Sequence, residues 1–348
     1  MISDRRVVSD RSSAPCRPVR IALTCGEPAG IGPEVVWKAL GSPQELEPGV
    51  EPVLVGPRSV WAGAARLVGG APGSVPWPVV EPGGGEAEDW DWGRPTEASA
   101  RVAARAVEAA TRLALEGRVE ALVTAPLTKE GLHRAGRPYP GHTEWLEALC
   151  GGGARATMML AGESLRVVLV TAHLPLAAVP GAVTGDRVLA ALRAAHRGLV
   201  GDLGIPSPRI GVAALNPHAG EGGLLGTEER EAILPAVEAA RREGIDARGP
   251  VPADALFFQA ATGAYDVVVA MYHDQGLGPL KLLHFHDGVN VTLGLPLVRT
   301  SPDHGTAYDI AGRGVAREDS CRQAVRWAAR IARRRRQGPS EASCGTGR

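Results

Sequence analysis

The stretch DVVVAMYHDQGLGPLKLLHF, residues 266–285, predicts a buried strand that ends at a polar loop beginning with His273. Two upstream stretches repeat this design. LRVVLVTAHLPL places His173 after an apolar run, and PRIGVAALNPHAGEGG places His218 after another. Short apolar runs rich in β-branched residues and bounded by glycine or proline are typical of buried strands. The sequence therefore predicts three strands that are each followed by a histidine.

Predicted strands and helices alternate along most of the chain, which indicates the α/β class. The helical patterns cover residues 35–40, 97–116, 143–149, 186–197, 228–243 and 317–334, with apolar strand patterns between them. Thr96 is placed to cap the helix at 97–116, and Gly117 to end it. The segment at 69–95 is too rich in proline and glycine for a helix and is interpreted as a surface excursion. Strands separated by helices predict parallel βαβ crossovers rather than hairpins.

The three histidines should meet, because the carboxyl ends of parallel strands share one edge of a sheet. Neutral imidazoles with one open coordination position are typical of a catalytic zinc site. A single loop histidine more often only hydrogen-bonds to the backbone, but three in the same context favour the metal. Asp274 and Asp254 are candidates for ligands, for supporting hydrogen-bond partners or for proton transfer. A helix N-cap is an equal alternative for Asp254.

Composition favours a small-molecule partner in a reducing compartment. The 348 residues contain 38 basic and 38 acidic side chains, so no overall field attracts nucleic acid or an anionic membrane. The five cysteines form no CxxC pair, which favours the cytoplasm. No long apolar run predicts secretion or membrane insertion. Residues 1–18 and 336–348 are expected to be disordered, with the basic cluster before the tail as a solvated helix end.

Two glycine-rich loops are candidates for anion binding. GEPAGIG carries Gly30 and Gly32 between a predicted strand and a helix, where backbone N–H groups and the helix dipole attract negative charge. It matches neither GxGxxG nor a P-loop. NPHAGEGG is the second loop. Lys281, Asn290 and Arg299 lie around the last predicted βα region, and arginine offers a two-pronged grip on phosphate or carboxylate.

Eight blocks taken in order, from about residue 19 to 329, closely resemble the 4-hydroxythreonine-4-phosphate dehydrogenases of pyridoxal phosphate biosynthesis. They are GEPAGIGPE, TAPLTKEG, GHTE, TAHLPL, NPHAGEGGLLGTEE, PADALF, AMYHDQGLGPLK and GVNVTLGLPLVRTSPDHGTA. The resemblance implies an isocitrate/isopropylmalate-dehydrogenase-like fold with two α/β/α domains. The first would combine residues 19–135 and 296–335, the second would be 136–295, and the active site would lie in the cleft at a homodimer interface.

The resemblance also implies the roles of individual residues. The divalent metal, zinc first with magnesium or cobalt as alternatives, would be held by His173, His218 and, from across the dimer interface, His273. Contacts to a small phosphorylated substrate would fall on His142, Thr143, Lys281, Asn290 and Arg299. Lys281 and Asp254 are the candidates for the general base.

The cofactor is expected to be NAD or NADP. DHGTAYDIAGRG resembles the adenosine-binding loop HGSAPDIAG of isopropylmalate dehydrogenases, in which the carboxylate matching Asp309 accepts hydrogen bonds from the ribose of NAD. That carboxylate would repel the 2′-phosphate of NADP. The rest of the cofactor side would be Gly30, Gly32, His304, Gly305, Thr306 and Ala307. The alternative for Asp309 is a cap on the following turn.

The resemblance implies oxidation of 4-phosphooxy-L-threonine at C3, followed by decarboxylation to 3-amino-2-oxopropyl phosphate. A dehydrogenase of 4-phosphothreonate or 4-phosphoerythronate would use the same chemistry on a substrate without an amino group. A zinc hydrolase with a three-histidine site, or a metal-binding module without catalysis, would need no dinucleotide. NAD reduction separates the dehydrogenases from these two.

Overall fold

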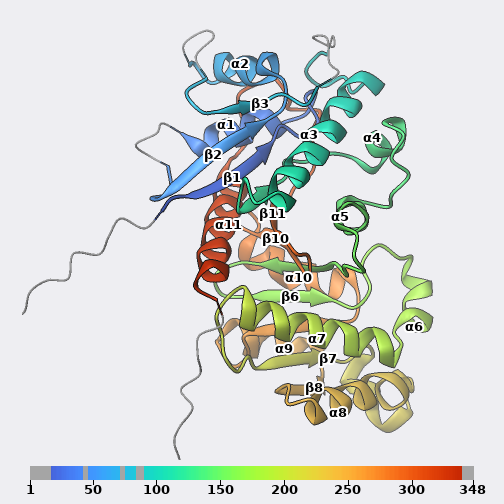
Figure 1. Cartoon of the computed structure of the whole chain (residues 1–348). Helices are drawn as coiled ribbons and strands as arrows, with labels where there is room; N and C mark the ends of the chain where they lie inside the picture. The colour runs from blue at the N-terminus through green and yellow to red at the C-terminus, as the bar shows by residue number, and fades with distance from the viewer. Residues whose placement is uncertain (1–16, 42–45, 71–74, 84–89, 339–348) are drawn as a thin grey trace, which may run out of the picture.

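The computed structural model of the chain describes residues 17–41, 46–70, 75–83 and 90–338. Of the predicted disordered ends 1–18 and 336–348, residues 1–16 and 339–348 fall outside these residues. The prediction was wrong at residues 336–337, which belong to the helix Asp319–Gln337. Within them the strands form one eleven-stranded sheet (Figure 1). Its order is β3 (Val79–Val80), β2 (Val50–Val55), β1 (Val19–Thr24), β4 (Ala121–Val123), β11 (Val298–Pro302), β10 (Val289–Leu293), β5 (Thr157–Ala161), β6 (Arg166–Leu169), β9 (Val267–Ala270), β7 (Ile210–Ala213) and β8 (Ala247–Val251).

The sheet is parallel at both ends and antiparallel in the middle. Strands β3, β2, β1, β4 and β11 are parallel neighbours, and so are β6, β9, β7 and β8. Strand β10 is antiparallel to both β11 and β5, and β5 is antiparallel to β6. The prediction of parallel crossovers throughout was therefore wrong at the centre. The mixed α/β class is confirmed.

Helices occupy the connections between these strands. They are α1 (Gly32–Leu40), α2 (Arg58–Leu67), α3 (Glu97–Leu115), α4 (Lys129–Arg134), α5 (His142–Cys150), α6 (Val179–Ala182), α7 (Gly185–Gly201), α8 (Leu234–Arg242), α9 (Ala253–Ala261), α10 (His273–His284) and α11 (Asp319–Gln337). The predicted start of α3 is confirmed, because the Thr96 side chain accepts from the Ser99 amide at 3.0 Å and a reciprocal bond completes a capping box.

Hydrophobic side chains are buried on both faces of the sheet at strands β6 and β9. Val168 and Val269 belong to the large hydrophobic cluster, which includes residues of α7 and α8. Their chain neighbours Val167 and Val268 belong to a second cluster, which includes residues of α9 and α10. Because successive side chains point to opposite faces of a strand, α7 and α8 cover one face and α9 and α10 the other.

The last helix, α11, packs along the middle of the sheet against β11, β4, β1 and β10 (Figure 1). Its basic end is held by acidic partners rather than solvated as predicted. Arg335 pairs with Asp202 at 2.7 Å, and Arg336 pairs with Glu120 at 2.5 Å. These contacts anchor the arginines to distant parts of the chain, so this cluster is part of the folded structure.

The proline- and glycine-rich segment is not only a surface excursion. Its residues 71–74 and 84–89 lie outside the described part of the chain. Trp77 is buried and packs edge-on against Trp37, with ring centroids 5.1 Å apart. Strand β3 extends the sheet beside β2. The segment therefore contributes both core and sheet, through aromatic side chains that outweigh its turn-rich composition.

The order of the strands in the sheet follows the predicted division of the chain into two domains. Strands β3 to β11 come from residues 19–135 and 296–335, and strands β10 to β8 come from residues 136–295. The sheet runs from one group to the other without a break. The division into two domains stays a prediction. No helix in the described ranges is long and apolar enough to cross a membrane.

Candidate active site

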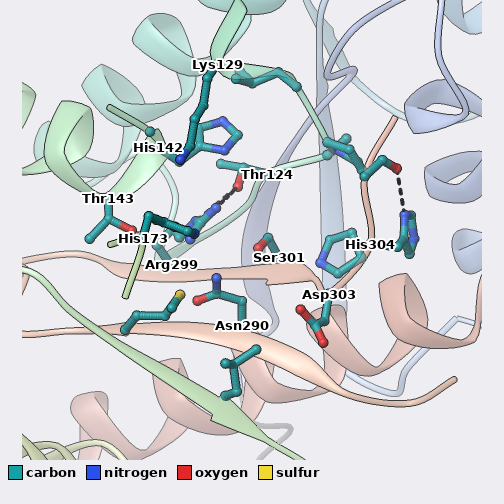
Figure 2. A pocket seen from close by; sticks show the side chains of 18 of the residues that line it. Thr124, Lys129, His142, Thr143, His173, Asn290, Arg299, Ser301, Asp303 and His304 are labelled. Carbon is teal, nitrogen blue, oxygen red and sulfur yellow. Dashed lines mark hydrogen bonds between the residues drawn. The ribbon is translucent and has the colours of Figure 1, made fainter. Parts of the chain in front are cut away.

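A cavity of about 420 Å³ lies at the centre of the sheet, where β4, β11, β10 and β5 are neighbours (Figure 2). It is lined by side chains from the ends of both groups of strands. The polar residues around it are Thr124, Lys129, His142, Thr143, Glu144, His173, His273, Lys281, Asn290, Arg299, Ser301, Asp303 and His304, and Gly305 completes the rim. All five predicted substrate residues are therefore brought to one cavity.

Arg299 is a buried cation, with only 2% of its surface exposed. Its Nε and Nη2 atoms donate to the Thr124 hydroxyl at 3.0 and 2.8 Å, and Nη1 donates to the Thr292 hydroxyl at 3.0 Å. Within the described ranges no carboxylate pairs with it. Burial lowers the pKa of Arg299 to about 10. An unpaired buried charge is costly, so this geometry favours an anionic ligand.

Three buried polar atoms of residues that line the cavity have no hydrogen-bond partner. They are Nε2 of His142, Oδ1 of Asn290 and Nε2 of His304. Burial, and then the charge of Arg299, hold the pKa of His142 well below its ordinary value. Burial also lowers the pKa of His304, whose Nδ1 lies 3.0 Å from the Gly305 carbonyl oxygen and so carries the proton. Orphaned polar atoms of this kind fit a polar ligand that the chain is built to receive.

Lys281 and Asp303 form an ion pair on the cavity wall. The Lys281 ammonium lies 3.2 Å from the Asp303 carboxylate and also donates to the Asp303 carbonyl oxygen at 3.2 Å. Burial raises the pKa of Asp303, while the neighbouring Lys281 opposes that rise. The pair holds the Lys281 amine at a defined place beside the cavity.

His173 and His273 meet as predicted from their strands. Strands β6 and β9 are adjacent, and the two imidazole rings lie 5.8 Å apart between centroids. Two imidazoles on one tetrahedral zinc ion would have centroids about 5 Å apart. Burial, Lys129 and His273 lower the pKa of His173, which favours the neutral, ligating form. The Nδ1 atom of His273 lies 2.7 Å from the Asp274 carboxylate, which leaves Nε2 for a metal.

His218 is not part of this cavity. It lies exposed at residues 217–223, and His218, Ala219 and Glu221 all have positive φ angles. Buried Glu229 holds the preceding chain by accepting from the Leu215 and Asn216 amides at 2.9 and 2.7 Å. In the part of the chain described, no group of three or more His, Cys, Asp or Glu side chains is placed to hold a metal. The three-histidine site, including its shared origin, stays a prediction.

Asp254 is also outside the cavity. It is exposed in the first turn of α9, and it lines an apolar groove with Phe257, Phe258 and Tyr272. The N-cap of this helix is Pro252, so the alternative role as N-cap is wrong. Nothing in a single chain places the Asp254 carboxylate beside Lys281.

The GEPAGIG loop is buried, which differs from the open anion-binding loop that we expected. The Gly30 amide donates to the Glu27 carbonyl oxygen at 3.0 Å, and the Ile31 amide donates to the Thr306 carbonyl oxygen at 2.9 Å. A Cβ atom at Gly30 would lie 2.9 Å from that Thr306 oxygen, and one at Gly32 would lie 2.6 Å from the Cys25 oxygen. Glycine is thus needed here for close backbone packing. Their contact with a cofactor stays a prediction.

The loop after β11 leads from the cavity to the predicted adenosine side. His304 and Gly305 line the cavity, whereas Thr306 is buried against the GEPAGIG loop. Ala307 has φ +41°, and Asp309 is exposed in the turn that follows. The carboxylate of Asp309 is therefore accessible to a ligand.

Sequence reasoning missed several cavity residues. Thr124 and Lys129 belong to the block TAPLTKEG, Glu144 belongs to GHTE, and Asp303 belongs to SPDHGTA. Each block was recognised as a motif, but its contribution to the cavity depends on strand order. Thr124, for example, follows β4 and contacts Arg299 only because β4 and β11 are neighbours.

Comparisons with known proteins agree with this geometry. A family model described as pyridoxal phosphate biosynthetic protein PdxA matches residues 53–328. The 4-hydroxythreonine-4-phosphate dehydrogenase of Geobacter metallireducens is 50% identical over 327 residues, which cover 90% of this chain and 96% of that protein. The crystal structure of the enzyme of that name from Klebsiella pneumoniae is 40% identical with a TM-score of 0.79, covering 90% of this chain and 99% of that one.

A more distant solved structure has a different name. The terephthalate 1,2-cis-dihydrodioldehydrogenase of Burkholderia xenovorans LB400 is 31% identical, with a TM-score of 0.63 over 90% of this chain and 98% of that one. The family model spans most of the chain, and the relatives match along nearly their whole length. This chain therefore belongs to the pyridoxal phosphate biosynthetic protein PdxA family.

Proposed function

We propose that this chain is a dehydrogenase that oxidises 4-phosphooxy-L-threonine at C3 with NAD(P) and releases CO₂ to give 3-amino-2-oxopropyl phosphate. The names of the relatives support the reaction. The observation that carries the substrate class is Arg299, a buried guanidinium with no carboxylate partner among the described residues. A phosphate group would satisfy its charge and accept from its remaining N–H groups.

The phosphate would bind at the buried end of the cavity. Arg299 supplies the charge, Asn290 supplies an amide, and neutral His142 supplies an imidazole whose Nε2 is otherwise unpartnered. A phosphate has enough acceptor atoms to engage these groups together. Lys281 and Asp303 then lie along the cavity wall, where the reacting carbons of the substrate would pass.

A divalent metal would be held by His173 and His273, with His218 as the third ligand from the resemblance. The low pKa of His173 and the Asp274 contact of His273 fit this role. When bound, the metal would supply Lewis acidity that acidifies the C3 hydroxyl and stabilises the enolate formed on loss of CO₂. Imidazole donors favour zinc, with magnesium or cobalt as alternatives.

Lys281 is the candidate for moving a proton at C3. Its amine lies in the cavity, and the Asp303 carboxylate at 3.2 Å fixes its direction. A lysine that has lost its proton can accept one from a hydroxyl, and it can return that proton to the enolate carbon after CO₂ has left. Asp254 stays a weaker candidate, because it lies outside the active-site cavity of its own subunit and would have to reach the cavity of a second subunit.

The nicotinamide cofactor would lie along the loop after β11. When bound, NAD or NADP accepts the hydride from C3. His304 and Gly305 would border its reactive end, and Asp309 would bind the ribose at the other, with Thr306 and Ala307 forming the backbone between. Gly30 and Gly32 would support this loop from behind, through the contact of the Ile31 amide with Thr306.

A homodimer is proposed from the outer face of α9 and α10. Phe258, Leu282, Leu283 and Phe285 are 72%, 87%, 49% and 69% exposed, which is unusual for such large apolar side chains. Asp254 lies in the groove between these helices, and His273 begins α10. A second copy docked here would cover the apolar face and could bring Asp254 or a further histidine to the partner's cavity.

A cytoplasmic location is proposed from the cysteines. Cys25, Cys150 and Cys321 are free thiols, and burial raises the pKa of each. A thiol kept protonated by burial is slow to react, which suits a reducing compartment without requiring one.

One alternative substrate class carries the same two anionic groups. The 31% identical structure carries the name of a dihydrodiol dehydrogenase, so relatives with this fold differ in substrate. Phosphorylated four-carbon sugar acids such as 4-phosphothreonate or 4-phosphoerythronate have the phosphate and carboxylate of the proposed substrate but no amino group. The test is NADH formation with each of the three compounds at equal concentration. The proposal requires the highest kcat/KM for 4-phosphooxy-L-threonine, and a higher value for either sugar acid would replace it.

A further inference from the structure

Lys129 is a cavity cation to which no role has yet been given. It is the first residue of α4, directly after the TAPLT turn that follows β4. The Thr128 side chain accepts from the Gly131 amide at 2.9 Å and so fixes the start of this short helix. Figure 2 shows the Lys129 side chain pointing into the cavity.

The charges around the cavity are not balanced. Lys129, Lys281 and Arg299 are its lysine and arginine residues, and Glu144 and Asp303 are its carboxylates. Asp303 is engaged by Lys281. Within the described ranges, neither Lys129 nor Arg299 has a carboxylate within ion-pair distance. Glu144 is in no ion pair among the described residues either, so the lining carries one more cation than carboxylates, and both Lys129 and Arg299 can pair with a ligand.

These two cations differ in burial. Arg299 is only 2% exposed, and it lines the cavity with His142 and Asn290, each of which has a buried polar atom without a hydrogen-bond partner. Lys129 is exposed and lines the same cavity. One positive group is thus enclosed among unpartnered polar atoms, and the other is open to solvent.

We propose that Lys129 binds the carboxylate of the substrate while Arg299 binds its phosphate. The inference rests on the proposed function, whose substrate carries one anionic group at each end of a four-carbon chain. The phosphate, with more acceptor atoms, suits the buried end with its several unpartnered groups. The carboxylate, at the other end of the substrate, then falls at the exposed side of the cavity, where Lys129 lies. Lys129 is on this account a further substrate-binding residue that selects for an acid.

Lys129 and Arg299 should differ in their effect on binding of the product. When the carboxylate leaves as CO₂, Lys129 loses its partner, whereas Arg299 keeps the phosphate. The product should therefore depend on Arg299 but not on Lys129. A ligand that lacks the carboxylate from the start, 3-amino-2-hydroxypropyl phosphate, should behave in the same way.

The test compares Lys129→Met with the wild type in binding two ligands, measured by calorimetry on metal-loaded protein. We expect the Kd of 4-phosphooxy-L-threonine to rise roughly tenfold or more, as for loss of one charged contact. The Kd of 3-amino-2-hydroxypropyl phosphate should stay within about twofold on the same scale. Lys129→Arg should recover most of the lost affinity, because it retains the charge.

Arg134→Met is the matched control, since Arg134 is a cation on the same helix that does not line the cavity and pairs with Glu130. It should change neither Kd, and equal metal content in all variants excludes an indirect effect through His173. An equal loss of both ligands in Lys129→Met, or no loss of either, overturns the assignment. Failure of the wild type to form NADH from 4-phosphooxy-L-threonine would instead refute the proposed function, and the assignment of Lys129 to that carboxylate with it.

Discussion

Replacing Arg299 by methionine should abolish binding of the phosphate without weakening the fold. Burial lowers the pKa of this guanidinium from an ordinary 12.5 to about 10. At about 1.4 kcal/mol for each factor of ten in acidity, the folded protein bears a cost of roughly 3 kcal/mol for holding the charge. Both the folded and the unfolded chain are protonated at neutral pH, so this cost is fully present there.

The substitution removes that cost together with the hydrogen bonds to the Thr124 and Thr292 hydroxyls. We therefore expect the free energy of unfolding to stay equal or rise by about 2 kcal/mol, as when buried charges are replaced by apolar groups. Urea denaturation at fixed protein concentration measures it, with and without inorganic phosphate. Phosphate should stabilise the wild type and have no effect on Arg299→Met.

Arg209→Met is the control, because Arg209 holds Asp266 through bonds of 3.1 and 3.0 Å and its loss leaves a carboxylate unpaired. This variant should be less stable than the wild type and should still respond to phosphate. If Arg299→Met were less stable than the wild type by 2 kcal/mol or more, on the scale of a lost buried pair, Arg299 would be a structural residue. The reasoning about an unsatisfied cation would then fail.

His173→Ala should lose bound metal and turnover together with little change in stability, because it removes a cavity ligand rather than core; full metal content by elemental analysis would contradict this. Mixing inactive His173→Ala and His273→Ala subunits should restore part of the activity if the site is shared, and no rescue after proven exchange would exclude sharing. Asp309→Ser should narrow the preference of kcat/KM for NAD over NADP, and an unchanged ratio would remove the accessible carboxylate from the ribose site. His142→Gln should reduce the loss of stability below about pH 6.5, since only the unfolded chain binds a proton there when the folded pKa is depressed; identical pH profiles would contradict this.

Elements with strong local signals could be predicted from the sequence. The helix cap at Thr96 and the apolar strands before His173 and His273 depend on neighbours in the chain, and the structure confirms them. Strand β5 was missed, because TMMLA lacks β-branched residues after its threonine and its methionines, leucine and alanine suit a helix as well. Its hairpin with β6, closed by the Gly162 amide and the Leu165 carbonyl oxygen at 2.9 Å, produced the antiparallel centre.

The candidate site was predictable only in part, because the order of the strands decides which residues share the cavity. Arg299 and Asn290 came from the resemblance, but the burial of Arg299 follows from β11 lying between β4 and β10. Asp303 follows β11 and Lys129 begins α4, far apart in the sequence, and no local pattern shows that they line one cavity. The GEPAGIG loop was predicted to bind an anion, but its glycines instead allow close packing against Thr306.

The most direct test of the central claim is the stoichiometry of the reaction with 4-phosphooxy-L-threonine labelled at the carboxylate carbon. NADH is followed by absorbance and labelled CO₂ is trapped from the same sample, with a chelator-treated sample beside it. The account predicts equal amounts of NADH and CO₂, both abolished by the chelator and restored by added zinc. NADH without CO₂, or equal turnover after removal of the metal, would contradict it.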